Sequence, residues 1–161
     1  MKVMYTRPED LGVSIVTAAP KADIEKVLGP LTPERYEAHV MERSVPADAI
    51  NPRRITDDAI PADREFRNAW VDVTAAAKVD IDLIKAKDLK LVELRAARDA
   101  ELAELDKGFM IALERGEDLE AIKARKQELR DVTEPLKNLQ VSGVNNKATL
   151  NQIKALAILE A

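Results

Sequence analysis

The sequence predicts a mostly helical α+β protein, in which a small N-terminal module with a short β-hairpin precedes a long antiparallel helical hairpin and a C-terminal helix. Three observations support this fold class. Seven of the eight prolines lie before residue 62, which favours short elements separated by turns in the first part. β-Branched residues gather near the N-terminus. The second half is a run of strong helix formers with apolar residues at helical spacing.

Residues 1–60 are expected to form a small α+β module. A turn signal that contains Pro8 and Gly12 separates two β-rich runs and predicts a hairpin. Thr32 is a favourable N-cap for a helix that begins with Pro33. In chain order, the expected elements are strands at 3–6 and 13–17, helices at 21–28 and 33–43, and an edge strand at 53–56.

Residues 61–77 are expected to form an aromatic junction segment. The chain has five aromatic residues, and two of them, Phe66 and Trp70, stand four positions apart. In a helix these two side chains share one face, and Arg67 reaches over the indole. Two interpretations stay open: the pair fills a core where the module meets the helices, or it anchors a partner. Phe66, Arg67 and Trp70 are therefore the candidate partner-binding residues.

Residues 78–138 are expected to form the helical hairpin. From about residue 74 to residue 115 the chain has no proline, and its leucines recur at spacings of three and four. This run predicts a first helix of roughly forty residues, about 60 Å long. Gly116 marks the turn, and Pro135 is expected to end the second helix.

Residues 139–161 are expected to form a loop and then a C-terminal helix from 147 to 160. The first helix of the hairpin is longer than the second, so its N-terminal part, with Ile81, Ile84 and Leu91, needs other cover. The C-terminal helix, the N-terminal module and another chain are the three alternatives.

A polar cluster is expected to fix the register of the hairpin. Its members are Arg95, Arg98 and Asp99 on the first helix and Gln127, Arg130 and Asp131 on the second. Buried polar pairs of this kind are used to set specificity. The alternative is a set of surface ion pairs, each worth under about 1 kcal/mol.

No catalytic residue, metal ligand or cofactor is predicted. His39 is the only histidine, and the glycines are scattered rather than gathered in a phosphate-binding loop. The acidic residues Asp57, Asp58, Asp63, Asp80 and Asp82 lack the spacing of a calcium loop and suit helix caps and turns. A metal-dependent enzyme that uses these acids is an alternative, which a titration with divalent cations would test.

Charge and hydropathy narrow the class of partner. The net charge of −4 and the pI near 5.2 argue against a nucleic-acid role. The sequence contains no run that approaches eighteen apolar residues, so no membrane-spanning helix is predicted. The absence of cysteine suits a reducing cytoplasm or an assembly made there.

One segment resembles a known signature. The run Ile-Pro-Ala-Asp-Arg-Glu-Phe-Arg-Asn-Ala-Trp at residues 60–70 is similar to the Ile-Pro-x-Asp-Arg-x-Phe-Arg-x-Ala-Trp pattern of small proteins from the tail and tail-fibre gene clusters of tailed bacteriophages. The runs at 94–106 and 126–132 resemble the hairpin of the phage tail assembly chaperone family. The similarity covers roughly residues 60–135. It departs at Lys107 and Phe109, where many members have Trp after the preceding Asp, and at the C-terminal helix, which replaces a proline-containing aromatic ending.

The resemblance implies a non-enzymatic phage tail protein associated with the tail fibre or tail tip. Such a protein is expected to be a structural adaptor of the virion tail that is made in the host cytoplasm. It is expected to bind a tail-fibre, baseplate or tail-tip protein, and to form a homo-oligomer, with a trimer as one arrangement because fibres are commonly trimeric. The alternatives are a tail assembly chaperone that leaves the finished particle and a free cytoplasmic helical regulator.

Overall fold

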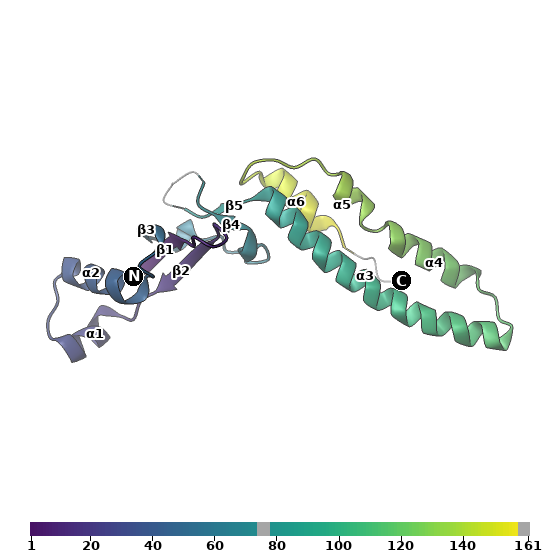
Figure 1. The fold of residues 1–161 in the computed structure, drawn as a ribbon, viewed down its shortest axis with the longest axis horizontal. Coiled ribbons are helices and arrows are strands. Elements are labelled where there is room, and N and C mark those ends of the chain that lie inside the picture. The colour runs from purple at the N-terminus through teal and green to yellow at the C-terminus, as the bar shows by residue number, and fades with distance from the viewer. Residues whose placement is uncertain (74–77, 158–161) are drawn as a thin grey trace. The chain divides into compact units, whose positions relative to one another are not determined.

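The computed structural model describes residues 1–73 and 78–157. The chain divides into two compact units, Met1–Asp82 and Leu83–Ala161. Figure 1 shows a sheet-containing N-terminal unit, coloured purple to blue-green, and a helical C-terminal unit, coloured teal to yellow. The predicted fold class, α+β and mostly helical, is confirmed.

The N-terminal unit is built on a three-stranded antiparallel sheet with the order β2-β1-β3. Its strands are β1 (Lys2–Thr6), β2 (Val13–Thr17) and β3 (Ile50–Ile55). The predicted hairpin of β1 and β2 is confirmed, with Met4 opposite Ile15. The predicted third strand is also confirmed, and its edge position tolerates Pro52, which has no N–H to donate to a sheet.

Two helices pack on one face of this sheet. They are α1 (Lys21–Leu28) and α2 (Pro33–Ser44). The Thr32 side chain accepts a hydrogen bond from the Arg35 amide at 3.3 Å, which confirms the predicted cap. Val40 and Tyr36 of α2 are buried together with Val3. Because successive strand residues point to opposite faces, Val3 places these helices on the face opposite to Met4.

The face of Met4 is covered by the segment that follows β3. This segment contains the 3₁₀ turns η1 (Asp57–Ala59) and η2 (Arg67–Ala69) and a ribbon formed by β4 (Trp70–Val71) and β5 (Asp80–Ile81). The buried residues of this second core are Met4, Val13, Ile55, Ala59, Trp70 and Val79. The described residues of the segment between β3 and α3 thus form a second layer of the N-terminal unit, over the Met4 face of the sheet.

The prediction of a helix around Phe66 and Trp70 is wrong. The Asp63 carboxylate accepts a hydrogen bond from the Glu65 amide at 2.9 Å, a local turn that competes with helix formation. The following 3₁₀ turn lasts three residues, and Trp70 then enters β4. Phe66 and Trp70 therefore do not share a helical face. Both are buried, at 3% exposure each. Trp70 packs in the sheet core of the N-terminal unit itself, whereas the packing interpretation placed the pair in a core shared with the helices.

The C-terminal unit consists of four helices within the described residues. They are α3 (Leu83–Arg115), α4 (Glu120–Asp131), α5 (Glu134–Asn138) and α6 (Lys147–Ala155). The 33 residues of α3 span about 50 Å at about 1.5 Å per residue. Gly116, at a φ of 68°, ends α3 in the left-handed conformation that favours glycine, as predicted.

The long helix is covered along both halves. Figure 1 shows α4 returning beside the C-terminal half of α3, while α6 packs beside its N-terminal half. Leu91 and Leu94 of α3 are buried, and so is Ile153 of α6. Of the three alternatives for covering the first turns, the C-terminal helix supplies the cover for Leu91, whereas Ile84 stays exposed.

Three predicted helix boundaries differ from the structure. The first helix begins at Leu83 rather than near residue 74, because Asp80 and Ile81 pair with β4 as a strand. Residues 74–77 of that expected span lie outside the described residues. Pro135 does not end α4, which stops at Asp131; it stands in the first turn of α5, where a missing N–H costs nothing. The last helix ends at Ala155, and residues 158–160 of its expected span are not described.

Candidate functional site

The junction segment forms a compact turn with buried and exposed sides. The Arg67 amide donates to the Arg64 carbonyl at 3.0 Å, and the Ala69 amide donates to the Phe66 carbonyl at 2.9 Å. Phe66, Ala69 and Trp70 are buried, whereas Arg64 and Arg67 are exposed. The apolar side chains therefore anchor the turn, and the two arginines project from it.

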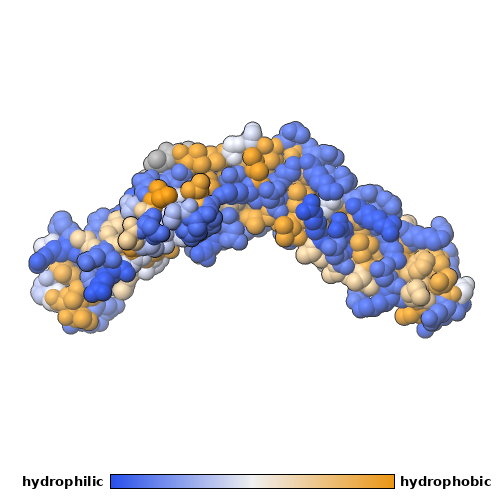
Figure 2. All heavy atoms as spheres, viewed as in Figure 1, coloured by the Kyte–Doolittle hydropathy of each residue, from blue (hydrophilic) through white to orange (hydrophobic). Residues whose placement is uncertain are grey.

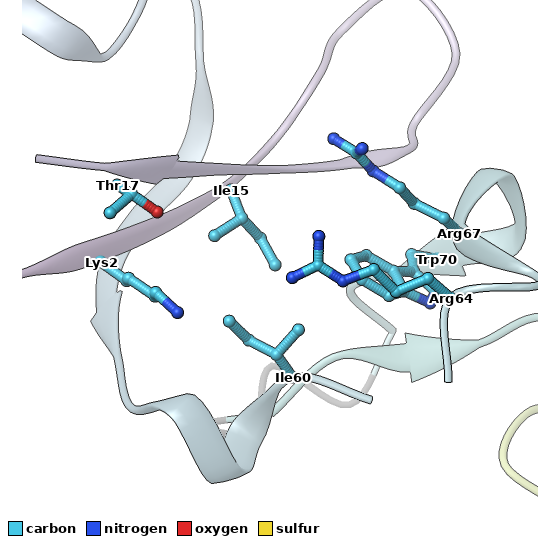
Figure 3. A pocket seen from close by; sticks show the side chains of 7 residues that line it. All are labelled: Lys2, Ile15, Thr17, Ile60, Arg64, Arg67 and Trp70. Atoms are coloured by element: carbon cyan, nitrogen blue, oxygen red, sulfur yellow. The ribbon is translucent and has the colours of Figure 1, made fainter. Parts of the chain in front are cut away.

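The two arginines border a pocket of about 80 Å³ on the sheet face that bears Met4. Its lining residues are Lys2, Ile15, Thr17, Ile60, Arg64, Arg67 and Trp70. Figure 3 shows the Lys2 ammonium and the Arg64 guanidinium extending toward the space between Ile15 and Ile60, with the Trp70 indole behind Arg64. Two of the three candidate partner-binding residues, Arg67 and Trp70, thus meet at one pocket.

The three cationic side chains that line this pocket differ in whether they form an ion pair within the chain. Lys2 forms an ion pair with Asp57, whose side chain is mostly exposed. Across residues 1–73 and 78–157, the structure shows no hydrogen bond or ion pair for the side chain of Arg64 or Arg67. The predicted stacking of Arg67 on the indole is likewise not among the contacts of the described residues, whose cation–π pair is Lys126 over Phe109 at 4.4 Å.

A buried ion pair lies at the ribbon of the same unit. Arg53 of β3 donates two hydrogen bonds to the Asp72 carboxylate, at 2.5 and 2.6 Å, and Asn51 donates a third at 3.0 Å. The Asp72 side chain is 3% exposed and the Arg53 side chain 21%. Asp80 is buried nearby and accepts from the Val73 amide at 3.2 Å. This bidentate pair ties β3 to the end of β4.

The ion pair sets the protonation of Asp72. The hydrogen bonds from Arg53 lower the pKa of Asp72, while burial and the neighbouring Asp80 oppose that shift. A carboxylate whose pKa is lower in the folded state stabilises the fold above its unfolded pKa, which is about 3.9. This stability is lost as the pH falls below about 4 and through the folded pKa.

Asp72→Asn is expected to lower the free energy of unfolding of the N-terminal unit by about 2–3 kcal/mol at neutral pH, because Arg53 loses a charged acceptor. The cost is below that of a fully buried pair since Asp80 still faces the partly exposed Arg53. The variant should also lose part of the acid sensitivity. Urea titrations followed by the fluorescence of Trp70, the only tryptophan, measure both effects. Asp48→Asn, at an exposed position, is the control, and an Asp72→Asn curve that matches it would contradict this role.

The predicted register cluster of the helical hairpin does not form. Arg98 pairs with its neighbour Asp99 at 2.7 Å, and Gln127 donates to Asp131 of the same helix at 2.9 Å. Arg95 and Arg130 are exposed. The two pairs that do form lie within single helices, because residues one to four positions apart lie closer than residues on the facing helix.

Other charges link α3 to α4. Arg125 pairs with Glu101 at 2.7 Å, and Lys126 pairs with Asp106 at 2.7 Å while it lies over the Phe109 ring. Arg125 and Lys126 are largely buried against α3, and each reaches it from the middle of α4. These pairs were not predictable from the sequence, because acids and bases occur throughout both helices.

Exposed apolar side chains gather at two places. Met110, Ile111 and Leu113 lie in the last turns of α3, and Val27 and Leu28 lie at the end of α1. Figure 2 shows apolar surface at the hairpin end of the helical unit and over α1. Beside α1, a hollow of about 420 Å³ is lined by residues of α1 and α2, among them the half-buried His39.

In the part of the chain that the structure describes, no three His, Cys, Asp or Glu side chains come together as a metal site. In the same residues, no helix has the length and apolar character that a membrane crossing requires.

No protein-family model, no curated protein and no solved structure matches this chain.

Proposed function

We propose that this chain is a non-enzymatic bacteriophage tail protein that associates with the tail fibre or tail tip as a structural adaptor of the virion. The observation that carries the proposal is the ordered resemblance over residues 60–135. Its first part, residues 60–70, folds as the turn that presents Arg64 and Arg67 at the pocket. Its second part is the α3–α4 hairpin.

The adaptor works by binding alone. The N-terminal unit docks on a tail-fibre, baseplate or tail-tip protein through the surface around Arg67 and Trp70. The end of α3, with Met110 and Leu113 three positions apart and both exposed, packs against a partner helix or a second copy of the chain. Three copies around one fibre satisfy the symmetry of a trimeric fibre. The proposal needs no cofactor, nucleic acid or membrane, and it places the protein in the virion tail after synthesis in the host cytoplasm.

Two structural features support a binding role. Exposed apolar side chains at one end of a helix favour contact with a partner, because their burial is worth about 25 cal/mol per Å². The cross-helix pairs of Arg125 and Lys126 hold the hairpin in one register, so this end of α3 is presented on a rigid element.

The proposal is tested by co-expressing the full chain, carrying an affinity tag, with each tail-fibre and tail-tip protein of its own gene cluster. The expected result is retention of one of them through purification. Met110→Glu combined with Leu113→Glu should weaken a partner held by the end of α3 by roughly tenfold, about 1.4 kcal/mol. Val92→Glu, at another exposed apolar position of α3, should leave retention unchanged.

Retention of no tail protein by the intact chain would contradict the proposal. A stable monomer with that behaviour would favour the free regulator instead. Equal retention by the double variant and the wild type would remove the end of α3 from the interface.

A further inference from the structure

The arginines of the pocket are placed by the backbone rather than by ion pairs. Arg64 and Arg67 stand at the two ends of one hydrogen-bonded turn, closed by the 3.0 Å bond from the Arg67 amide to the Arg64 carbonyl. Buried Phe66 and Trp70 hold the chain on either side of Arg67. The backbone at Arg64 and Arg67 is therefore ordered before any ligand arrives, so binding has to order only the two side chains.

The pocket gathers positive charge in a unit that is acidic as a whole. Residues 1–82 carry eleven Lys and Arg against fifteen Asp and Glu, a net charge of −4. Three of the eleven cations, Lys2, Arg64 and Arg67, nonetheless line this one pocket. The described residues give the guanidinium groups of Arg64 and Arg67 no acid partner, so their donors are available to a ligand.

The size and walls of the pocket select the ligand. About 80 Å³ holds two or three waters at about 30 Å³ each, or one group of a few heavy atoms. Ile15, Ile60 and Trp70 supply apolar walls, and the donors come from the three cations and the Thr17 hydroxyl. A planar carboxylate offers two oxygens to guanidinium donors and its CH₂ stem to an apolar wall. A phosphate ion has no hydrocarbon stem to place against these walls.

We infer that this pocket binds a carboxylate presented by a partner polypeptide, either an Asp or Glu side chain or a C-terminus. Arg64 and Arg67 hold the carboxylate oxygens, Lys2 and Thr17 complete the donors, and Ile15, Ile60 and Trp70 receive the stem. The inference deepens the proposed tail role and rests on it for the identity of the partner, whereas the ligand chemistry rests on the pocket alone.

Trp70 reports directly on occupancy because it lines the pocket and is the only tryptophan of the chain. The ¹⁵N-labelled full chain is titrated with four probes: an acetylated and amidated peptide with one central Glu, the same peptide with Gln, the Gln peptide with a free C-terminus, and inorganic phosphate. The expected result is a saturable shift of the Trp70 indole N–H signal with the Glu peptide, the free C-terminus or both. The amidated Gln peptide should produce none.

Arg64→Gln combined with Arg67→Gln should weaken that binding at least about tenfold. Arg35→Gln combined with Arg43→Gln removes the same charge from exposed positions of α2 and should bind as the wild type does. Urea midpoints of both double variants should match the wild type, since these four side chains are exposed.

An unchanged Trp70 signal with both carboxylate probes would overturn the inference, and so would equal binding by the Arg64/Arg67 variant. A shift with phosphate alone would replace the carboxylate with a tetrahedral anion. The failures of the two proposals are distinguishable. Retention of a tail protein without carboxylate binding refutes only the pocket assignment, and carboxylate binding without any retained tail protein refutes only the tail role.

Discussion

Trp70→Ala is expected to destabilise the N-terminal unit by about 3–5 kcal/mol, the cost of deleting a buried large aromatic side chain. Trp70 packs against Met4, Ile55 and Val79 in the core on one face of the sheet. A single small domain has a total stability of about 5–15 kcal/mol, so this loss removes a large share of it. The sheet itself stays paired by β1–β2 and β1–β3 hydrogen bonds, but one of its two faces loses its largest cover.

The unfolding of this variant is measurable although the only tryptophan is gone. Both tyrosines, Tyr5 and Tyr36, belong to the N-terminal unit, so tyrosine fluorescence during a urea titration follows that unit. Val27→Ala, at a position 83% exposed, is the control and should change the stability by less than about 0.5 kcal/mol. A Trp70→Ala loss below about 1 kcal/mol would show that Trp70 does not hold this core.

Leu129→Ala is expected to cost the helical unit about 2–5 kcal/mol. Leu129 is 1% exposed and is the buried residue of α4, the helix that covers the C-terminal half of α3. No other residue of α4 is buried, so the loss of this side chain leaves a cavity that the helix does not fill with a second core residue.

Far-UV circular dichroism during a urea titration follows this unit, because most helical residues belong to it. The matched control is Leu113→Ala in α3, where the side chain is 53% exposed and the loss should stay within about 0.5 kcal/mol. Equal losses for the two variants would mean that α4 is not packed against α3 through Leu129.

Local signals in the sequence were sufficient for most elements. The turn around Pro8 and Gly12 defined the first hairpin, Thr32 defined the start of α2, and Gly116 defined the end of α3. Each of these residues acts on its own few neighbours, by fixing a dihedral angle or satisfying a terminal amide, so its effect is visible in a short window.

The ribbon of β4 and β5 was not predictable from such windows. Each strand has two residues, too few for an alternating pattern, and Asp80 occupies a buried position because it accepts from the Val73 amide. The helix expected from about residue 74 rested on helix propensity, which a tertiary contact of this kind overrides. The same ribbon places Trp70 in a strand rather than on a helical face.

The pocket and the hairpin register depend on residues that are distant in the sequence. Lys2 reaches the pocket from β1, whereas Arg64 and Arg67 come from the junction turn. The register of α3 and α4 uses Glu101 with Arg125 and not the expected Arg98 and Asp131. A single sequence does not show which acid of one helix pairs with which base of the other, because acids and bases occur throughout both helices.

Quantitative mass spectrometry of purified virions tests the central claim most directly. Particles of the phage that encodes this chain are purified through two density gradients, and the chain is counted against the major tail-tube protein and against a non-structural phage protein as a contamination control. The adaptor account predicts a fixed number of several copies per particle, unchanged between the two gradients. A chain that is abundant in infected cells but falls to the level of the non-structural protein in clean virions would contradict the adaptor and favour an assembly chaperone or a free regulator.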